Sequence, residues 1–252
     1  MGRKKEIILL CVLILFLFAI NYPFVNNAII EFLDESEIAR VERIIDGDTI
    51  VVENNTHVRL LGINTPEKGE KYYNEAKDFL NMILLNKTIK LEYGKDKIDK
   101  YGRKLAYIFY NGANVNLELV DEGYANFYFP SGKDEYYGKF VKNWEHCISR
   151  NKNLCEKSGD KCSRCIELKS LDIKKQEIIF YNKCDFDCSL KNWEIKDEGR
   201  KKFIFGNFIL EKNREIKITA EDFNEEYVWT ETGDTLFLRD EEGKLVLWKI
   251  FD

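Results

Sequence analysis

The pattern of apolar and polar residues predicts strands at residues 38–67 and a helix after them. Apolar and polar residues alternate through VERIIDGDTIVVE, are interrupted by an Asp-Gly dipeptide, and alternate again through THVRLLGI. This alternation is typical of half-buried strands, and Asp-Gly favours a tight turn between them. Residues 72–85 then carry apolar side chains at helical spacing, which predicts an amphipathic helix.

The elements that follow predict a small barrel. Strand patterns return at residues 88–94 and 104–110, and a short helix is expected at 114–123, where Gly123 suits the helix end. A last helix is expected at about 135–150. Strands, a helix, more strands and two helices, joined by short connections, are typical of an OB-fold barrel with three helices.

Residues 166–252 predict a second domain made of strands. Short apolar segments are separated there by turn signals such as Asp-Glu-Gly, and their spacing predicts an all-β sandwich of about ninety residues. The polar segment SGDKCSRC, which follows Lys157, separates this sandwich from a barrel domain at residues 36–158. The predicted fold is therefore mainly β, with an α+β domain followed by an all-β domain.

The first 25 residues carry an export signal. MGRKKE is followed by fourteen uninterrupted apolar residues at positions 7–20, and the apolar stretch extends through Val25. A basic start and an apolar stretch are typical both of a cleaved signal peptide and of an uncleaved anchor. No small-x-small cleavage site follows, which favours an anchor crossing the membrane through residues 7–25, with the N-terminus in the cytoplasm. A cleaved signal would give a secreted protein.

Six of the seven cysteines follow the export signal, and an oxidising compartment favours disulfides between them. Their pairing does not follow from the sequence. A structural Zn²⁺ is the alternative, because two pairs of cysteines lie near the spacing of a zinc ribbon. The four cysteines that would bind Zn²⁺ are Cys162, Cys165, Cys184 and Cys188.

The charge balance limits how the chain could bind nucleic acid. With 39 Lys and Arg against 44 Asp and Glu, the net charge is −5. We therefore expect phosphate binding to depend on a few arginines at defined positions rather than on a basic surface. The two histidines, His57 and His146, stand outside every motif, which argues against a histidine-dependent hydrolase.

Oxygen-bearing side chains gather in two short segments, IDGDT and GINTPE. Asp48, Asn64 and Glu67 offer the oxygens that a hard divalent cation such as Ca²⁺ binds, provided that the two strand ends are neighbours. Arg59 lies on the strand that enters the second segment, and Arg103 follows a Tyr-Gly turn before another strand. A cation, a carboxylate and two guanidinium groups are what phosphodiester cleavage requires.

Five motifs, in their order and at their distances, resemble the staphylococcal-nuclease-like, or thermonuclease, family over about residues 40–157. The motifs are DGDT, RLLGINTPE, YYNEA, DKYGRKLAYIF and VNLELVDEGYA. The resemblance implies an OB barrel with three helices. It also implies Ca²⁺-dependent endonuclease activity, the hydrolysis of DNA and RNA, with Mn²⁺ or Mg²⁺ as alternative ions.

The resemblance also implies the ligands of one metal ion. Matched by motif, Asp48, Asn64 and the carbonyl of Thr65 would bind it. Type members of the family have an aspartate where this chain has Asn64, so one negative charge is missing here. Because an amide oxygen still coordinates Ca²⁺, we expect weaker metal binding rather than inactivity.

The same matching implies the other roles. Glu67 would orient or deprotonate the attacking water, and Arg59 and Arg103 would stabilise the phosphoryl transition state. Tyr101 and Tyr128 are candidates for binding the substrate, and core packing is an equal explanation for Tyr128.

The C-terminal segment resembles the lamin-tail domain over about residues 166–252. LKNWEIKDEG, a strand pair and VWTETGDTLFLRDEEGKLV carry this resemblance. It implies an immunoglobulin-like sandwich with a binding or tethering role, whose ligand the sequence does not identify.

Together these patterns predict an extracytoplasmic, metal-dependent nuclease with DNA, RNA or both as substrate. Two other functions stay open. The barrel would serve as a non-catalytic module that binds single strands by stacking and charge, or the sandwich would be a cell-surface adhesin with an ancillary barrel. The presence of both arginines and of Glu67 favours the nuclease.

Overall fold

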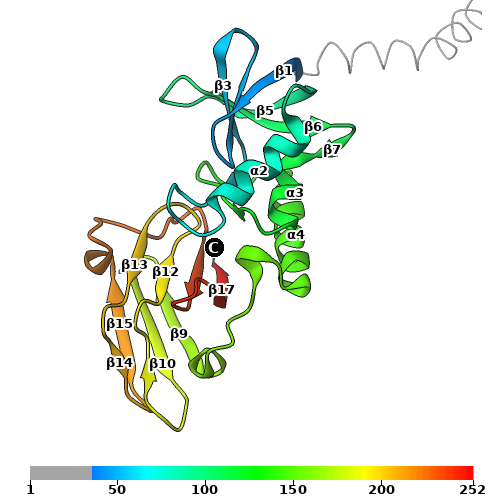
Figure 1. The fold of residues 1–252 in the computed structure, drawn as a ribbon. Coiled ribbons are helices and arrows are strands. Elements are labelled where there is room, and N and C mark those ends of the chain that lie inside the picture. Colours follow the sequence, from blue (N-terminus) through cyan, green and yellow to red (C-terminus); the bar gives the residue numbers. More distant parts are fainter. Residues whose placement is uncertain (1–35, 252) are drawn as a thin grey trace, which may run out of the picture. The chain divides into compact units, whose positions relative to one another are not determined.

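The computed structural model describes residues 36–251 (Figure 1). The predicted export signal at residues 1–25, including the membrane segment 7–25, lies outside the described residues. Between residues 36 and 251, no helix is both long enough and apolar enough to cross a membrane. Ile38–Asp252 form one compact unit that contains two clusters of buried apolar residues.

Five strands close into the predicted OB-like barrel. The sheet runs in the order β3-β2-β1-β5-β6-β7, and β3 also pairs with β6 in parallel, which closes the barrel. Every residue of β2, which reads TIVV, is buried, as suits β-branched side chains in a strand. The five barrel strands are β1 (Ser36–Ile44), β2 (Thr49–Val52), β3 (Thr56–Leu60), β5 (Thr88–Ile98) and β6 (Lys104–Tyr110), and the two-residue strand β7 (Ala113–Asn114) pairs with β6.

Three helices accompany the barrel, close to their predicted positions. α2 buries Ala76, Leu80 and Leu84, which follow one another at intervals of four residues and therefore share a face. α3 begins after Asn114, whose side chain accepts a hydrogen bond from an amide of the first turn, and the chain leaves it through Gly123 at φ 72°. The helices are α2 (Tyr73–Leu84), α3 (Val115–Asp121) and α4 (Tyr137–Arg150).

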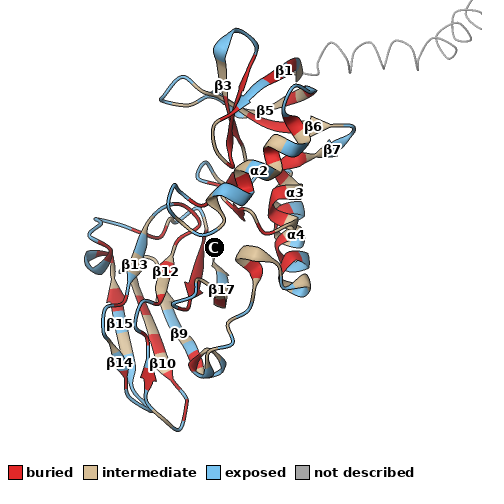
Figure 2. Cartoon of the chain, in the orientation of Figure 1, coloured by how far each residue is buried: buried red, intermediate tan, exposed pale blue. Residues whose placement is uncertain are grey.

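The first core lies among the barrel strands and the helices, which carry many buried residues (Figure 2). Two buried residues from the C-terminal part of the chain, residues 166–251, belong to it as well. The ring of Phe237 packs against those of Phe127 and Trp144, with centroids 6.3 Å and 5.4 Å apart. Leu245 belongs to the same core. Buried aromatic contacts, each contributing about 0.5–1.5 kcal/mol beyond its buried area, thus join the two parts of the chain.

The C-terminal part is built from β-strands and short 3-10 turns, as predicted. Two sheets, ordered β15-β10-β9 and β13-β12-β16-β17, share the second core, to which Phe180 of β10 and Ile195 of β12 both belong. The resemblance to the lamin-tail domain stays a prediction. The strands are β9 (Ile166–Asp172), β10 (Glu177–Asn182), β11 (Cys188–Ser189), β12 (Glu194–Lys196), β13 (Lys202–Ile204), β14 (Ile209–Leu210), β15 (Glu215–Thr219), β16 (Asp234–Arg239) and β17 (Leu245–Phe251).

Six cysteines form three disulfides. The four cysteines considered for Zn²⁺ form two of these disulfides. Zn²⁺ binds cysteine as a thiolate, and a sulfur in a disulfide is not a thiolate. Their sulfurs gather closely, since the Sγ atoms of Cys184 and Cys188 are 3.3 Å apart. The pairs are Cys147–Cys155, Cys162–Cys188 and Cys165–Cys184.

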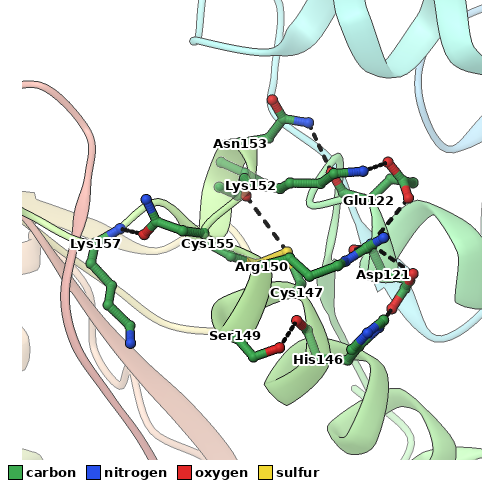
Figure 3. Close-up of a disulfide and its surroundings, with 12 residues drawn as sticks. Asp121, Glu122, His146, Cys147, Ser149, Arg150, Lys152, Asn153, Cys155 and Lys157 are labelled. Carbon is green, nitrogen blue, oxygen red and sulfur yellow. Dashed lines mark hydrogen bonds and ion pairs between the residues drawn. A yellow bond between two sulfur atoms is a disulfide. The ribbon is translucent and has the colours of Figure 1, made fainter.

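The first of these disulfides ties the end of α4 to the turn that follows it (Figure 3). Beside it, Arg150 donates hydrogen bonds to the carboxylates of Asp121 at 2.7 Å and Glu122 at 3.0 Å, both at the end of α3. Lys152 also pairs with Glu122. The disulfide and these ion pairs hold the two helix ends together at the point where the chain leaves for the C-terminal part.

Candidate active site

Asp48 occupies a tight connection between β1 and β2. A Cβ at the neighbouring Gly47 would lie 2.7 Å from the Cβ of Ala76 and 2.9 Å from the methyl group of Thr65, so the motif requires glycine there. The main-chain oxygen of Asp48 accepts a hydrogen bond from the Leu60 amide at 2.8 Å. The connection is thus packed against α2 and against the segment that holds Asn64, Thr65 and Glu67.

The carboxylate of Asp48 joins groups that are distant in sequence. Its Oδ2 accepts a hydrogen bond from the Thr65 hydroxyl at 3.1 Å and lies 3.1 Å from Nη2 of Arg59. Asp48 is 4% exposed and Arg59 is 8% exposed, so the ion pair is buried. Arg59 also donates to the main-chain oxygens of Leu60 and Ile63, which fixes the plane of its guanidinium.

Arg103 lies immediately before β6, the strand that pairs with the strand of Arg59. In the parallel pairing of β3 with β6, Arg59 is the partner of Leu105, and Arg103 stands two positions before Leu105. Both Nε and Nη2 of Arg103 lie 2.7 Å from Oδ2 of Asp99, and its guanidinium lies 5.5 Å from the ring centroid of Tyr101.

Asn64 belongs to the short strand β4 (Ile63–Asn64), which pairs with β8 (Asn126–Phe127). It is 2% exposed, and its Nδ2 donates a hydrogen bond to the main-chain oxygen of Gly199 at 2.6 Å. Its Oδ1 is therefore the end of the amide that is available to a cation. Thr65, the third predicted metal ligand, is also buried.

Glu67 lies three residues beyond Asn64 and is half exposed. Its Oε1 is 2.7 Å from Nε of Arg200, a residue of the C-terminal part. The side chains of Glu67 and Arg200 are 50% and 63% exposed, so this ion pair faces solvent. The predicted general base is thus accessible and is held by a cation from outside the barrel.

Tyr128 follows β8, and its amide donates a hydrogen bond to the Gly62 oxygen at 2.9 Å. Burial and then the charge of Asp197 raise the pKa of its phenol. A Cβ at Gly199 would lie 3.3 Å from its ring. Tyr128 therefore packs against the C-terminal part, while Tyr101, which is 72% exposed, is open to a substrate.

Three residues at the site are additional to those that the sequence predicts. Asp46, the first carboxylate of the Asp-Gly-Asp motif, accepts a hydrogen bond from the Asp48 amide at 3.1 Å, and the motif itself was the signal for it. Gly199 and Arg200 lie 135 and 133 positions from their partners Asn64 and Glu67. No sequence pattern links residues so far apart, because only the packing of the two parts brings them together.

The residues at the Asp48 connection suit a hard cation. Asp46, Asp48, Asn64 and Thr65 offer oxygen atoms, which are the ligands that Ca²⁺, Mn²⁺ and Mg²⁺ prefer. Burial and the charge of Asp48 raise the pKa of Asp46. A cation there would offset both the burial of these carboxylates and their mutual repulsion, so the donor set fits the metal that the sequence predicts.

The chain is similar to several known proteins. The family model described as "Staphylococcal nuclease homologue" matches residues 57–165. A thermonuclease of Staphylococcus intermedius is 37% identical over 105 residues, which cover 38% of this chain and 62% of that protein. An SPbeta prophage-derived endonuclease of Bacillus subtilis is 33% identical over 150 residues, covering 54% of this chain and 51% of that protein.

An uncharacterized protein of Methanocaldococcus jannaschii is 36% identical over 145 residues, which cover 44% of this chain and 70% of that protein. The chain spans about three fifths of the length of the thermonucleases that it matches.

Proposed function

The chain belongs to the staphylococcal nuclease homologue family, and from this we propose that it is a metal-dependent nuclease that hydrolyses phosphodiester bonds of DNA, RNA or both. One observation carries the proposal. The buried ion pair of Asp48 with Arg59 places a fixed guanidinium beside oxygen donors that suit a cation. A packing role alone does not call for a buried charge pair.

Each residue has a part in the proposed reaction. Arg59 and Arg103 offer N–H groups to the phosphate oxygens, where negative charge accumulates in the transition state. Glu67 lies at the solvent-facing side and orients or deprotonates the attacking water. Tyr101, beside Arg103, offers an exposed ring on which a base can stack. Tyr128 is the second proposed contact to substrate.

Asp48, Asn64 and Thr65 would hold the metal ion, and Asp46 adds a second carboxylate. We propose Ca²⁺ as the ion, with Mn²⁺ or Mg²⁺ as substitutes. When bound, the ion would polarise the phosphate and activate water. The protein's own contribution is to fix the ligand groups: the carboxylate of Asp48 by Thr65 and Arg59, and the amide of Asn64 by Gly199.

We also propose that the protein acts outside the cytoplasm, anchored to the membrane through residues 7–25. Three disulfides support this location, because such bonds persist mainly in oxidising compartments. The C-terminal part would then remain on the outer side together with the nuclease. Its ligand is not part of the proposal.

The proposal is tested by digesting labelled single-stranded DNA and RNA with the purified full-length protein, with Ca²⁺, Mn²⁺ or a chelator added. The wild type is compared with Glu67→Ala and with Glu75→Ala, a matched loss of an exposed glutamate from the first turn of α2. We expect cleavage only with metal, a loss of at least about a hundredfold for Glu67→Ala, and an unchanged rate for Glu75→Ala. Binding without cleavage under every metal condition would instead favour the non-catalytic module.

A further inference from the structure

A turn of the C-terminal part, residues 197–201, lies against the candidate active site. It connects β12 to β13 in a hairpin. The Asp197 amide donates to the Lys201 oxygen at 3.1 Å, and the Lys201 amide donates to Oδ1 of Asp197 at 2.9 Å. These two bonds close the turn and present Gly199 and Arg200 at its tip.

Buried hydrogen bonds fix this turn on the barrel. Nδ2 of Asn126 donates to the main-chain oxygen of Glu198 at 2.8 Å, and the Phe129 amide donates to Oε1 of Glu198 at 2.9 Å. Glu198 is itself 6% exposed. The turn therefore keeps its place beside β8 independently of Arg200, whose side chain can be changed without removing these bonds.

Gly199 determines which way the amide of Asn64 faces. Because the main-chain oxygen of Gly199 accepts a hydrogen bond, it binds the Nδ2 end of the amide and leaves Oδ1 for a cation. An aspartate at position 64 would place an acceptor against this oxygen. The asparagine that departs from the family's type members is thus the side chain that this turn accommodates.

Arg200 fixes the carboxylate of Glu67. The 2.7 Å contact between Nε and Oε1 is a charge-assisted hydrogen bond, which orients the carboxylate that is proposed to act on water. Because both side chains are at least half exposed, such a pair contributes little to stability. Its consequence is for the orientation of Glu67 rather than for the fold.

We propose that the nuclease centre is composite: the 197–201 turn completes it, with the Gly199 oxygen as the positioning group for Asn64 and Arg200 as the positioning residue for Glu67. This inference rests on the proposed nuclease function. It gives the C-terminal part a role in the reaction itself, beyond any binding or tethering role.

The test measures kcat and KM for metal-dependent cleavage by the full-length protein with Arg200→Ala, Arg200→Lys and Arg214→Ala. Arg214 is the matched control, an exposed arginine of the C-terminal part that pairs with Glu211. We expect Arg200→Ala to lower kcat on the order of tenfold to a hundredfold, because a misplaced catalytic group costs a factor of this size. KM should change by less than about twofold. Arg200→Lys should restore most of kcat, and Arg214→Ala should match the wild type.

Two further measurements complete the experiment: the cleavage rate of Arg59→Ala, and the thermal unfolding midpoints of Arg200→Ala and the wild type. If Arg59→Ala abolishes cleavage while Arg200→Ala equals Arg214→Ala, the nuclease stands and the composite centre is wrong. A higher kcat in Arg200→Ala would make the turn an inhibitory clamp and would equally overturn the inference. Absence of cleavage in the wild type would overturn the nuclease and the composite centre together. Equal unfolding midpoints of Arg200→Ala and wild type would show that a lowered kcat does not come from unfolding.

Discussion

Asn64 donates a hydrogen bond to the main-chain oxygen of Gly199, a residue 135 positions further along the chain, at a distance of 2.6 Å. The contact links a predicted metal ligand of the barrel to a turn of the C-terminal part. It gives the one departure from the family's metal ligands a structural reason, since an amide can donate to a carbonyl oxygen and a carboxylate cannot. The chemistry of the site and the packing of the two parts therefore depend on the same side chain.

Asn64→Asp should therefore lower the stability of the metal-free protein and raise its affinity for metal. Without metal, the carboxylate faces the Gly199 oxygen in a buried site, and we expect the free energy of unfolding to fall by about 1–3 kcal/mol. With Ca²⁺ or Mn²⁺ the added charge should raise metal affinity and recover part of this loss. Urea unfolding with and without metal, and calorimetric titration of the ion, measure both effects.

Asn207→Asp is the control, because it makes the same change at an exposed position of the C-terminal part. We expect it to leave both stability and metal affinity as in the wild type. An unchanged metal affinity in Asn64→Asp would mean that position 64 is not a ligand.

Asp48→Asn should destabilise the protein and abolish cleavage. The buried guanidinium of Arg59 would lose its ionic partner, and breaking such a pair from one side costs about 3–5 kcal/mol. Urea unfolding measures the stability, and the DNA assay measures the rate. Asp96→Asn, an exposed aspartate on β5, is the control that should change neither. Wild-type stability in Asp48→Asn would contradict the buried pair.

The stability of the protein should fall as the pH rises from about 4 to about 7. Burial raises the pKa of both Asp197 and Glu198 to about 7, with the charge of Asp234 adding to the effect. The folded state then binds more protons than the unfolded state across this range, so the free energy of unfolding decreases with rising pH and levels off above it. The expected decrease is on the order of 3–4 kcal/mol for each group.

Glu198→Gln tests the origin of this pH dependence. Its amide oxygen can still accept from the Phe129 amide, but it carries no charge at high pH. Urea unfolding at pH 5 and pH 8 should show a smaller difference for this variant than for the wild type. Equal differences would assign the pH dependence to other groups.

Thiol titration distinguishes the disulfides from the Zn²⁺ alternative. Seven cysteines are present and six are paired, so the denatured, unreduced full-length protein should show one reactive thiol. A chelator should not change this number. Four additional thiols released by the chelator would instead indicate Zn²⁺ bound by Cys162, Cys165, Cys184 and Cys188.

Local sequence patterns were sufficient to predict the helices and strands. They were not sufficient to predict the long-range packing. The helix expected at residues 72–85 is found at Tyr73–Leu84, because Ala76, Leu80 and Leu84 repeat at helical spacing. The cysteine pairing stayed open, since six cysteines allow fifteen connectivities that spacing does not separate. The link from Arg200 to Glu67 depends on how two cores join at Phe237, which no periodicity in the sequence encodes.

The candidate site shows the same division between what local sequence patterns predict and what only long-range packing determines. Asp48, Arg59 and Thr65 stand within 17 positions of one another, and the structure brings them into one hydrogen-bonded group. Asp46 belongs to the same motif and was within reach of sequence reasoning. Gly199 is a turn residue that carries no chemical signal of its own, because its contribution is a main-chain oxygen.

The most direct test of the nuclease centre is the initial rate at which Arg59→Ala cleaves end-labelled single-stranded DNA in Ca²⁺, compared with Arg43→Ala. Arg43 is an exposed barrel arginine whose side chain donates a hydrogen bond to exposed Asn55. The account predicts a loss of about a hundredfold to a thousandfold for Arg59→Ala, the usual effect of removing one donor to a transition-state oxyanion, and a wild-type rate for Arg43→Ala. Equal rates for the two variants would contradict it.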